Sequence, residues 1–231
     1  MLRLEAACKT YIRHGKAVEA LRPTSLDIRA GEYVAVVGPS GCGKSTFLTV
    51  VGGMLAPTTG RVLLEGRSLY DLTVSQRAAV RGTRIGFVFQ TFNLVPYLTA
   101  LENVQVPLYL AGVAPREQRR RATAGLERVG LADRLGHKPS ELSVGQQQRV
   151  ALARTLVNDP ALILADEPTG NLDPEAREQA LSLFDTFHGE GRTLIVVTHD
   201  PAVAARAGRS LRMEAGGVTE GRAVACERNV A

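Results

Sequence analysis

A glycine-rich run near the start of the chain has the residue types and spacing of a phosphate-binding loop. The run is Gly38-Pro39-Ser40-Gly41-Cys42-Gly43-Lys44-Ser45-Thr46, which has the pattern Gly-x-x-x-x-Gly-Lys-Ser. Glycines let backbone N–H groups wrap a polyphosphate, the lysine reaches the β- and γ-phosphates, and the serine hydroxyl can bind Mg²⁺. The whole run is therefore predicted to bind a nucleoside triphosphate. Lys44 is also expected to act in catalysis, and Ser45 to be a metal ligand.

The segments on either side of this loop fit the same interpretation. Residues 33–37 form a short apolar run typical of a buried strand, and residues 47–51 continue as a helix. A helix that begins at the loop presents the positive end of its dipole to a bound anion. The alternative, a chance glycine-rich turn, would require neither flanking segment.

A second candidate site follows another buried strand. Residues 161–165 are continuously apolar, and Asp166 and Glu167 come directly after them. Ligands of open α/β sheets bind at the carboxyl ends of the strands, so both carboxylates are expected at that edge. Asp166 is predicted to bind Mg²⁺, and Glu167 to polarise the attacking water as general base. The alternative is an acidic pair that only caps a helix.

The order of the apolar runs predicts an α/β fold. The N-terminal part contains short strands and turns, and further apolar strands at 161–165 and 193–197 flank a helix over 175–188. Continuous apolar strands that alternate with helices are typical of a parallel sheet covered on both faces. From about residue 101 to residue 158 the periodicity is helical instead.

These segments predict a single domain over residues 1–231. We expect a nucleotide-binding core with a mostly parallel sheet, over about 1–92 and 160–231, that includes an antiparallel β portion at the N-terminus. A helical subdomain over about 93–159 is expected as an insertion in that core.

Composition excludes several other classes of protein. With 45% apolar residues the chain can bury a core, and no run approaches the ~18 apolar residues of a membrane span. Charges interrupt the N-terminus too early for a secretory signal. Cys8, Cys42 and Cys226 lack metal-type spacing, which argues against both a zinc site and a disulfide framework. A cytoplasmic protein is therefore expected.

The charge of the chain gives a weaker signal. The formal net charge is +5, which is compatible with anionic lipid or nucleic acid nearby but favours an ordinary solvated surface. The basic run at 116–121 has no aromatic residues between its arginines, so it is interpreted as the polar face of a helix. No nucleic-acid partner is expected.

A third run connects the chain with a known family. Leu142-Ser143-Val144-Gly145-Gln146-Gln147-Gln148-Arg149 leads into a helix, and Asp166-Glu167-Pro168-Thr169-Gly170-Asn171-Leu172-Asp173 follows downstream. Together they resemble the signature of the ATP-binding cassette (ABC) family, the motor subunits of ABC transporters. The resemblance implies ATP and Mg²⁺ as ligands, and a homodimer that sandwiches two ATP molecules. It also implies an integral membrane permease as partner, on the inner face of the cell membrane.

The same resemblance implies roles for residues outside the two motifs first considered. Tyr11 resembles the aromatic residue that stacks on adenine, with an ordinary surface tyrosine as the alternative. Gln90 resembles the glutamine that touches Mg²⁺ and water while facing the permease. His199 resembles the histidine that contacts the γ-phosphate, with a buried core histidine as the alternative.

The signature run and the segment after Glu167 are implied to act across the dimer. Ser143, Gly145 and Gln146 are expected to bind the nucleotide that the opposite subunit holds. Asp173 lies where the family has its cross-subunit contact. One subunit alone should therefore hydrolyse ATP poorly.

Val144 departs from the usual signature, which has a glycine at this position. Ser143 followed three residues later by Gln146 fits a capping box, with Ser143 as N-cap and Val144 at the first helical position. Val144 then has an ordinary helical φ. Gly145 is predicted to be the position where a Cβ would intrude on the bound anion.

Cys42 lies inside the phosphate loop, beside Lys44 and the start of a helix. This position predicts a thiol that maleimide reagents modify and that MgATP protects.

Three further runs, at 87–94, 98–104 and 170–173, resemble the branch of lipoprotein-release, macrolide-exporter and cell-division ATPases. An ATPase subunit of an export or lipoprotein-release complex is therefore expected. One alternative is a regulator that controls cell-wall enzymes through a membrane partner. Another is a cassette ATPase that acts on DNA or ribosomes, although such proteins usually have two cassettes or a long insertion. A small GTPase is disfavoured because the chain has no Asn-Lys-x-Asp sequence.

Overall fold

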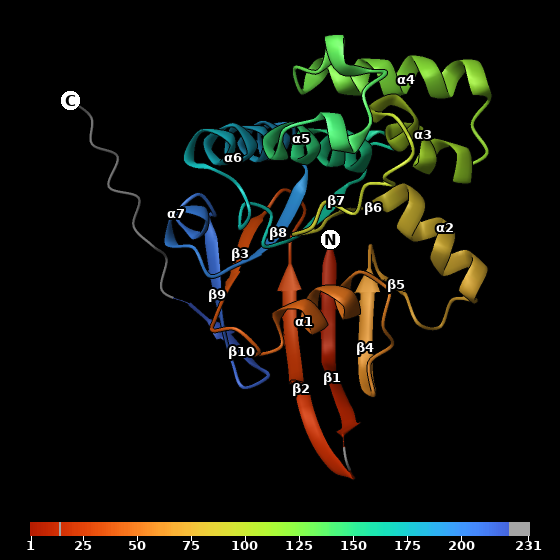
Figure 1. Cartoon of the computed structure of the whole chain (residues 1–231). Helices are drawn as coiled ribbons and strands as arrows, with labels where there is room; N and C mark the ends of the chain where they lie inside the picture. The colour runs from red at the N-terminus through yellow and green to blue at the C-terminus, as the bar shows by residue number, and fades with distance from the viewer. Residues whose placement is uncertain (14, 222–231) are drawn as a thin grey trace. The chain divides into compact units, whose positions relative to one another are not determined.

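The structure is a computed structural model that describes residues 1–13 and 15–221 (Figure 1). It divides into two compact units. Unit 1 comprises Met1–Arg77 and the C-terminal part from Gly191, and unit 2 comprises Ala78–Glu190. Cys226 lies outside the described residues.

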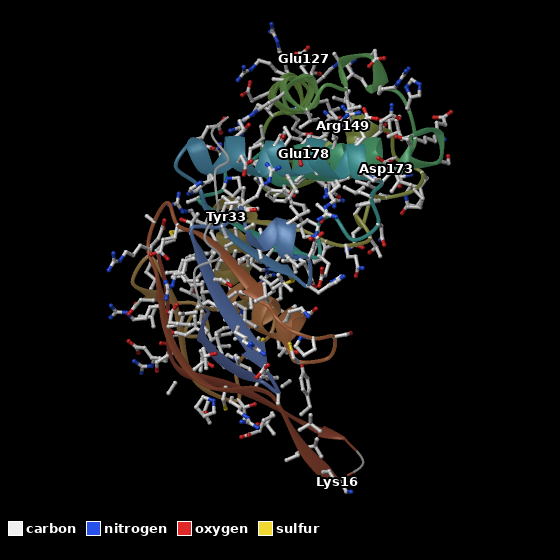
Figure 2. All side chains as sticks on the ribbon, turned by 90° about the vertical axis from the view of Figure 1, so that its left-hand side faces the viewer. Lys16, Tyr33, Glu127, Arg149, Asp173 and Glu178 are labelled. Atoms are coloured by element: carbon white, nitrogen blue, oxygen red, sulfur yellow. The ribbon has the colours of Figure 1, made fainter. Side chains whose placement is uncertain are left out.

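An antiparallel sheet forms the N-terminal part of unit 1, as the sequence predicts. Its strand order is β2-β1-β4-β5, with the bounds Leu2–Arg13 for β1, Lys16–Ile28 for β2, Thr59–Leu64 for β4 and Arg67–Ser68 for β5. Strands β1 and β2 pair from Leu2↔Ile28 to Arg13↔Lys16 and form a long hairpin with Lys16 at its tip (Figure 2).

A parallel group of strands forms the rest of the β structure in unit 1. Strand β3 (Tyr33–Val37) lies between β8 (Thr193–Thr198) and β9 (Arg209–Glu214) and is parallel to both. At the edge, β10 (Gly217–Glu220) pairs antiparallel with β9. Every residue of β8 is buried, which explains its continuously apolar sequence. Helix α1 (Lys44–Val51) follows β3, and α7 (Pro201–Ala204) follows β8.

Unit 2 combines a parallel strand pair with most of the helices. Strands β6 (Ile85–Val88) and β7 (Leu162–Asp166) are parallel. The helices that follow along the chain are α3 (Ala100–Leu110), α4 (Pro115–Arg128), α5 (Val144–Leu156) and α6 (Pro174–Gly189). Short 3₁₀ turns lie at Ala132–Arg134 and Pro139–Glu141. Helix α5 contacts α3, α4 and α6, and Figure 1 shows α6 running alongside it.

The helices of unit 2 share a hydrophobic core. Its fully buried members include Val104 and Leu108 of α3, Leu126 of α4 and Val150 of α5. These residues recur at helical spacing in the sequence, which is why the sequence predicts an inserted helical segment here. Among the described residues, no helix is both long enough and apolar enough to cross a membrane.

Several elements were not expected from the sequence, and two of them show why. Strand β2 is 13 residues long, whereas the sequence indicated only short strands in the N-terminal part. Most of its side chains are exposed, so its sequence shows no apolar run. Helix α2 (Val74–Arg84) was missed for a similar reason, since it has no buried residue. Apolar periodicity detects only the elements that bury a face.

Candidate functional site

The phosphate loop joins the buried strand β3 to helix α1, as predicted. Gly41 and Gly43 have φ of 76° and 111°, a backbone region that residues with a Cβ rarely adopt. Lys44 is 8% exposed, and its Nζ donates hydrogen bonds to the carbonyl oxygens of Gly38 at 2.8 Å and Pro39 at 3.0 Å. The first turn of α1 has no acidic side chain and no side-chain cap, which suits the binding of an anion.

Two glycines of this loop are also required by packing behind it. An ideal Cβ at Gly38 would lie 2.2 Å from the carbonyl oxygen of Met213, and one at Gly43 would lie 2.1 Å from that of Ala20. Strands β9 and β2 therefore press closely against the loop. The sequence suggested only a phosphate-binding reason for these glycines.

Cys42 differs from its sequence-based expectation. Its side chain is 7% exposed, and its Sγ lies 2.8 Å from the position that a Cβ on Gly38 would take. The thiol is thus packed inside the loop. This packing argues against ready modification in this conformation, because a maleimide must reach the sulfur. Labelling of Cys42 and its protection by MgATP stay predictions.

His199 lies at the same sheet edge as the phosphate loop. Strands β3 and β8 pair in parallel up to Val37↔Thr198, so the loop and His199 leave the carboxyl ends of neighbouring strands. The His199 side chain is exposed. This rules out the alternative of a buried core histidine.

Tyr11 lies on the β1–β2 hairpin, paired with Val18. Its side chain is partly exposed, and the Nζ of Lys9 lies 5.6 Å from the ring centroid. A partly exposed ring of this kind can offer a stacking surface to a base. Its role as the adenine contact stays a prediction.

In unit 2 the two carboxylates and Gln90 lie at one strand edge. Strands β6 and β7 pair up to Val88↔Ala165, which places Gln90 and Asp166 just beyond neighbouring strand ends. The Asn171 side chain donates to the Gln90 carbonyl at 3.1 Å. A Cβ on Gly170 would lie 3.3 Å from Gln90 Nε2. The Gln90 side chain therefore lies beside the turn that follows the carboxylates.

Glu167 has an unusual backbone. Its φ is +46°, and its carbonyl accepts a hydrogen bond from the Gly170 N–H at 3.1 Å. A non-glycine residue in this left-handed region costs about 1–2 kcal/mol, and such strain is concentrated at functional sites. The helix after the acidic pair, α6, is capped by Asp173 instead. Asp166 and Glu167 therefore do not cap α6, which was the alternative interpretation of this acidic pair.

Asp173 forms the N-cap of α6. Its carboxylate accepts the Ala176 N–H at 2.8 Å, and Figure 2 shows it at the end of that helix. This bond lies within the chain. The expected cross-subunit contact of Asp173 stays a prediction.

The signature run has the predicted capping box. The Ser143 side chain accepts the Gln146 N–H at 3.2 Å, and the Ser143 N–H donates to Gln146 Oε1 at 3.0 Å. Val144 is the first residue of α5 and is 45% exposed. The prediction that Val144 has an ordinary helical conformation is confirmed.

Gly145 is required for a reason that the sequence did not suggest. An ideal Cβ at this position would lie 2.7 Å from the Ala176 Cβ, closer than real Cβ contacts. The missing side chain therefore faces α6 of the same chain. The sequence had placed a bound anion there.

Arg154 on α5 was missed by the sequence analysis. Its guanidinium donates to the carbonyl oxygens of Phe92 and Asn93, both at 2.6 Å. Burial lowers the pKa of Arg154. Phe92 and Asn93 have φ of 58° and 49°, so Arg154 supports a left-handed turn just after Gln90. The sequence did contain a signal for this residue, because a basic side chain inside an apolar helical segment must find a partner.

Comparison with known proteins agrees with the fold and these motifs. A family model described as "ABC transporter" matches residues 21–170. The chain belongs to the ABC transporter family and is an ATP-binding cassette ATPase.

Individual relatives cover most of the chain. An uncharacterized ABC transporter ATP-binding protein of Thermotoga maritima is 52% identical over 200 residues, 87% of this chain and 86% of the relative. The macrolide export ATP-binding/permease protein MacB of Brucella melitensis is 48% identical over 216 residues. That match covers 94% of this chain but only 33% of MacB.

A solved structure extends the comparison to the whole fold. The post-hydrolysis dimer of the ATP-binding cassette MJ0796, bound to ADP and Pi, superposes with a TM-score of 0.88 at 40% identity. The match covers 95% of this chain and 98% of that chain. The antiparallel N-terminal sheet, the mostly parallel sheet and the helical subdomain predicted from the sequence are therefore the ABC ATPase fold.

Proposed function

We propose that this chain is the ATP-hydrolysing motor subunit of a membrane ABC complex for export or lipoprotein release, bound to the inner face of the cell membrane. The observation that carries the proposal is the likeness to MacB, whose name describes a cassette and a permease in one protein. This chain matches only the cassette-sized 33% of that relative. Its permease would be a separate protein or a part of the protein outside this sequence.

Each candidate residue has a role in ATP binding or hydrolysis that fits its chemistry. The loop from Gly38 to Thr46 binds the phosphates, Tyr11 stacks on the adenine, and His199 contacts the γ-phosphate. Glu167 accepts the proton of the attacking water as general base. Its position at the strand end, held in a strained conformation, supports this role.

Three oxygen donors fit the Mg²⁺ that accompanies ATP. They are the hydroxyl of Ser45, the carboxylate of Asp166 and the amide oxygen of Gln90, which are the ligand types that Mg²⁺ prefers. Ser45 is exposed on the first turn of α1, and the other two share a strand edge in unit 2. When bound, Mg²⁺ would neutralise charge on the phosphates.

A head-to-tail homodimer would complete each site. Ser143, Gly145 and Gln146 begin α5 at an exposed or partly exposed surface, where they could meet the nucleotide held by a second copy. The dimeric structure of MJ0796 supports this arrangement. Asp173, at the exposed start of α6, is proposed as a further contact across the dimer.

The basic run on α4 supports the absence of a nucleic-acid partner. Arg120 and Arg121 both pair with Glu117 of the same helix, at 2.7 Å and 3.7 Å. Such pairs are typical of a solvated helix face. A regulator of cell-wall enzymes would use the same residues, so it remains the second candidate.

The membrane partner can be tested by fractionation. We expect the chain to remain in the supernatant when it is expressed alone, and to sediment with membranes when it is co-expressed with its permease partner. ATP turnover by the purified complex should then respond to the external substrate of that permease. A chain that never associates with the permease would contradict the proposal, and association without any transported substrate would favour the regulator.

A further inference from the structure

Helix α5 contacts both ends of the loop that carries Glu167 and Asp173. At the first end, Gln148 of α5 donates from Nε2 to the Pro168 carbonyl oxygen at 2.7 Å. Pro168 directly follows Glu167, whose φ is +46°. The bond therefore holds the backbone on the C-terminal side of the candidate general base.

At the other end of the loop, Gly145 packs against the start of α6. The contact with Ala176 is too close for a Cβ on residue 145, and the Ala176 N–H is itself held by Asp173. Gly145 and Gln148 are three residues apart and thus lie on the same face of α5. The signature end of α5 therefore contacts the loop at Pro168 and the first turn of α6, just after the loop, at Ala176.

Gln148 is an unusual residue for its surroundings. It is 0% exposed, and within the described residues its Oε1 has no hydrogen-bond partner. A buried amide oxygen without a partner destabilises a fold, and an apolar side chain of similar length would avoid this cost. A gain in folding stability therefore does not explain why residue 148 has an amide side chain. The hydrogen bond to the Pro168 carbonyl does explain it.

We propose that Gln148 is a positioning residue that fixes the backbone of Glu167 from the signature helix. Contact of the signature end of α5 with a nucleotide of the second copy would then set the position of the general base in the same chain. This inference rests on the proposed role of Glu167. It adds a link between the two active sites of the dimer.

The test compares two buried glutamines that make the same kind of bond. Gln148→Met removes the donor and keeps the side-chain length. The matched control is Gln118→Met on α4, where Nε2 donates to the Val113 carbonyl at 2.6 Å and the side chain is 9% exposed. We expect only Gln148→Met to lower kcat, by about tenfold to a hundredfold, as for a misplaced catalytic group. The melting temperature of Gln148→Met should fall no further than that of Gln118→Met, because the substitution also removes the unpartnered amide oxygen.

Two further readouts separate positioning from general damage. The KM for ATP should stay within about twofold in Gln148→Met, because the phosphate loop is unchanged. In a Glu167→Gln background, adding Gln148→Met should slow turnover no further, since residues that act through one another are not additive. An equal loss of kcat in Gln118→Met, or a full additional loss in the double variant, would overturn the proposal.

The outcomes also separate this inference from the proposed function. If Glu167→Gln itself hydrolyses ATP normally, the role of Glu167 fails. If Glu167→Gln is slow but Gln148→Met turns over like the wild type, only the positioning role fails. If Gln148→Met does not fold, Gln148→Leu takes its place. Loss of folding in both variants would show that the residue serves the fold itself, which also overturns the proposal.

Discussion

Glu167→Gln is expected to bind ATP like the wild type and to hydrolyse it about a hundredfold to ten-thousandfold more slowly, the range that a positioned base contributes. The amide keeps the size and shape of the side chain but cannot accept the proton of the attacking water. The left-handed backbone at Glu167 should be unaffected, because the substitution does not change the main chain. An ATP-bound dimer should accumulate, since its breakdown depends on hydrolysis.

Phosphate release measures the loss of hydrolysis, and analytical ultracentrifugation measures the accumulation of the ATP-bound dimer. The control is Glu127→Gln, an exposed side chain of α4 that Figure 2 shows at the top of the view, and it should leave turnover unchanged. Near wild-type phosphate release by Glu167→Gln in the purified complex would remove the residue from the role of base.

The second large effect is expected at Gly145. Gly145→Val should lower turnover about a hundredfold, which corresponds to about 3 kcal/mol of activation free energy, while the protein stays folded. The added side chain must push α5 away from Ala176, because even a Cβ would lie 2.7 Å from the Ala176 Cβ. Val144→Gly should change turnover by less than about threefold, since Val144 is an exposed residue at the start of the helix.

A double variant tests the cause of the glycine requirement. With Gly145→Ala and Ala176→Gly together, the nearest atom of residue 176 to the new Cβ is its Cα at 3.8 Å, an ordinary contact. We expect this pair to recover most of the turnover that Gly145→Ala alone loses. Failure of the rescue would restore the sequence-based explanation, in which the Cβ meets the anion. A strong effect of Val144→Gly on turnover would show that the active enzyme does not have Ser143 as N-cap and Val144 as the first residue of α5.

The sequence predicted the parts of the site that lie within one motif. The phosphate loop and the pair Asp166 and Glu167 follow buried apolar strands, so their placement at strand ends could be inferred from local patterns. The capping box at Ser143 depends only on residues three positions apart, and it was also predictable.

Contacts between distant segments were not predictable from local patterns. The closeness of Gly145 to Ala176, of Gln148 to Pro168 and of Gly38 to Met213 depends on how helices and strands pack. Cys42 shows the same limit, because its burial follows from the path of the loop and not from its neighbours in sequence. The exposed elements β2 and α2 lacked the apolar signal on which the prediction relied.

The dependence of ATP turnover on chain concentration tests most directly whether two copies share each site. Turnover per chain is measured with saturating MgATP, from dilute to concentrated protein. We expect turnover per chain to rise with concentration and then level off, because the phosphate loop of one copy needs Ser143 and Gly145 of another. A turnover per chain that stays constant from the most dilute to the most concentrated sample, with the chain sedimenting as a monomer throughout, would show that one copy holds a complete site.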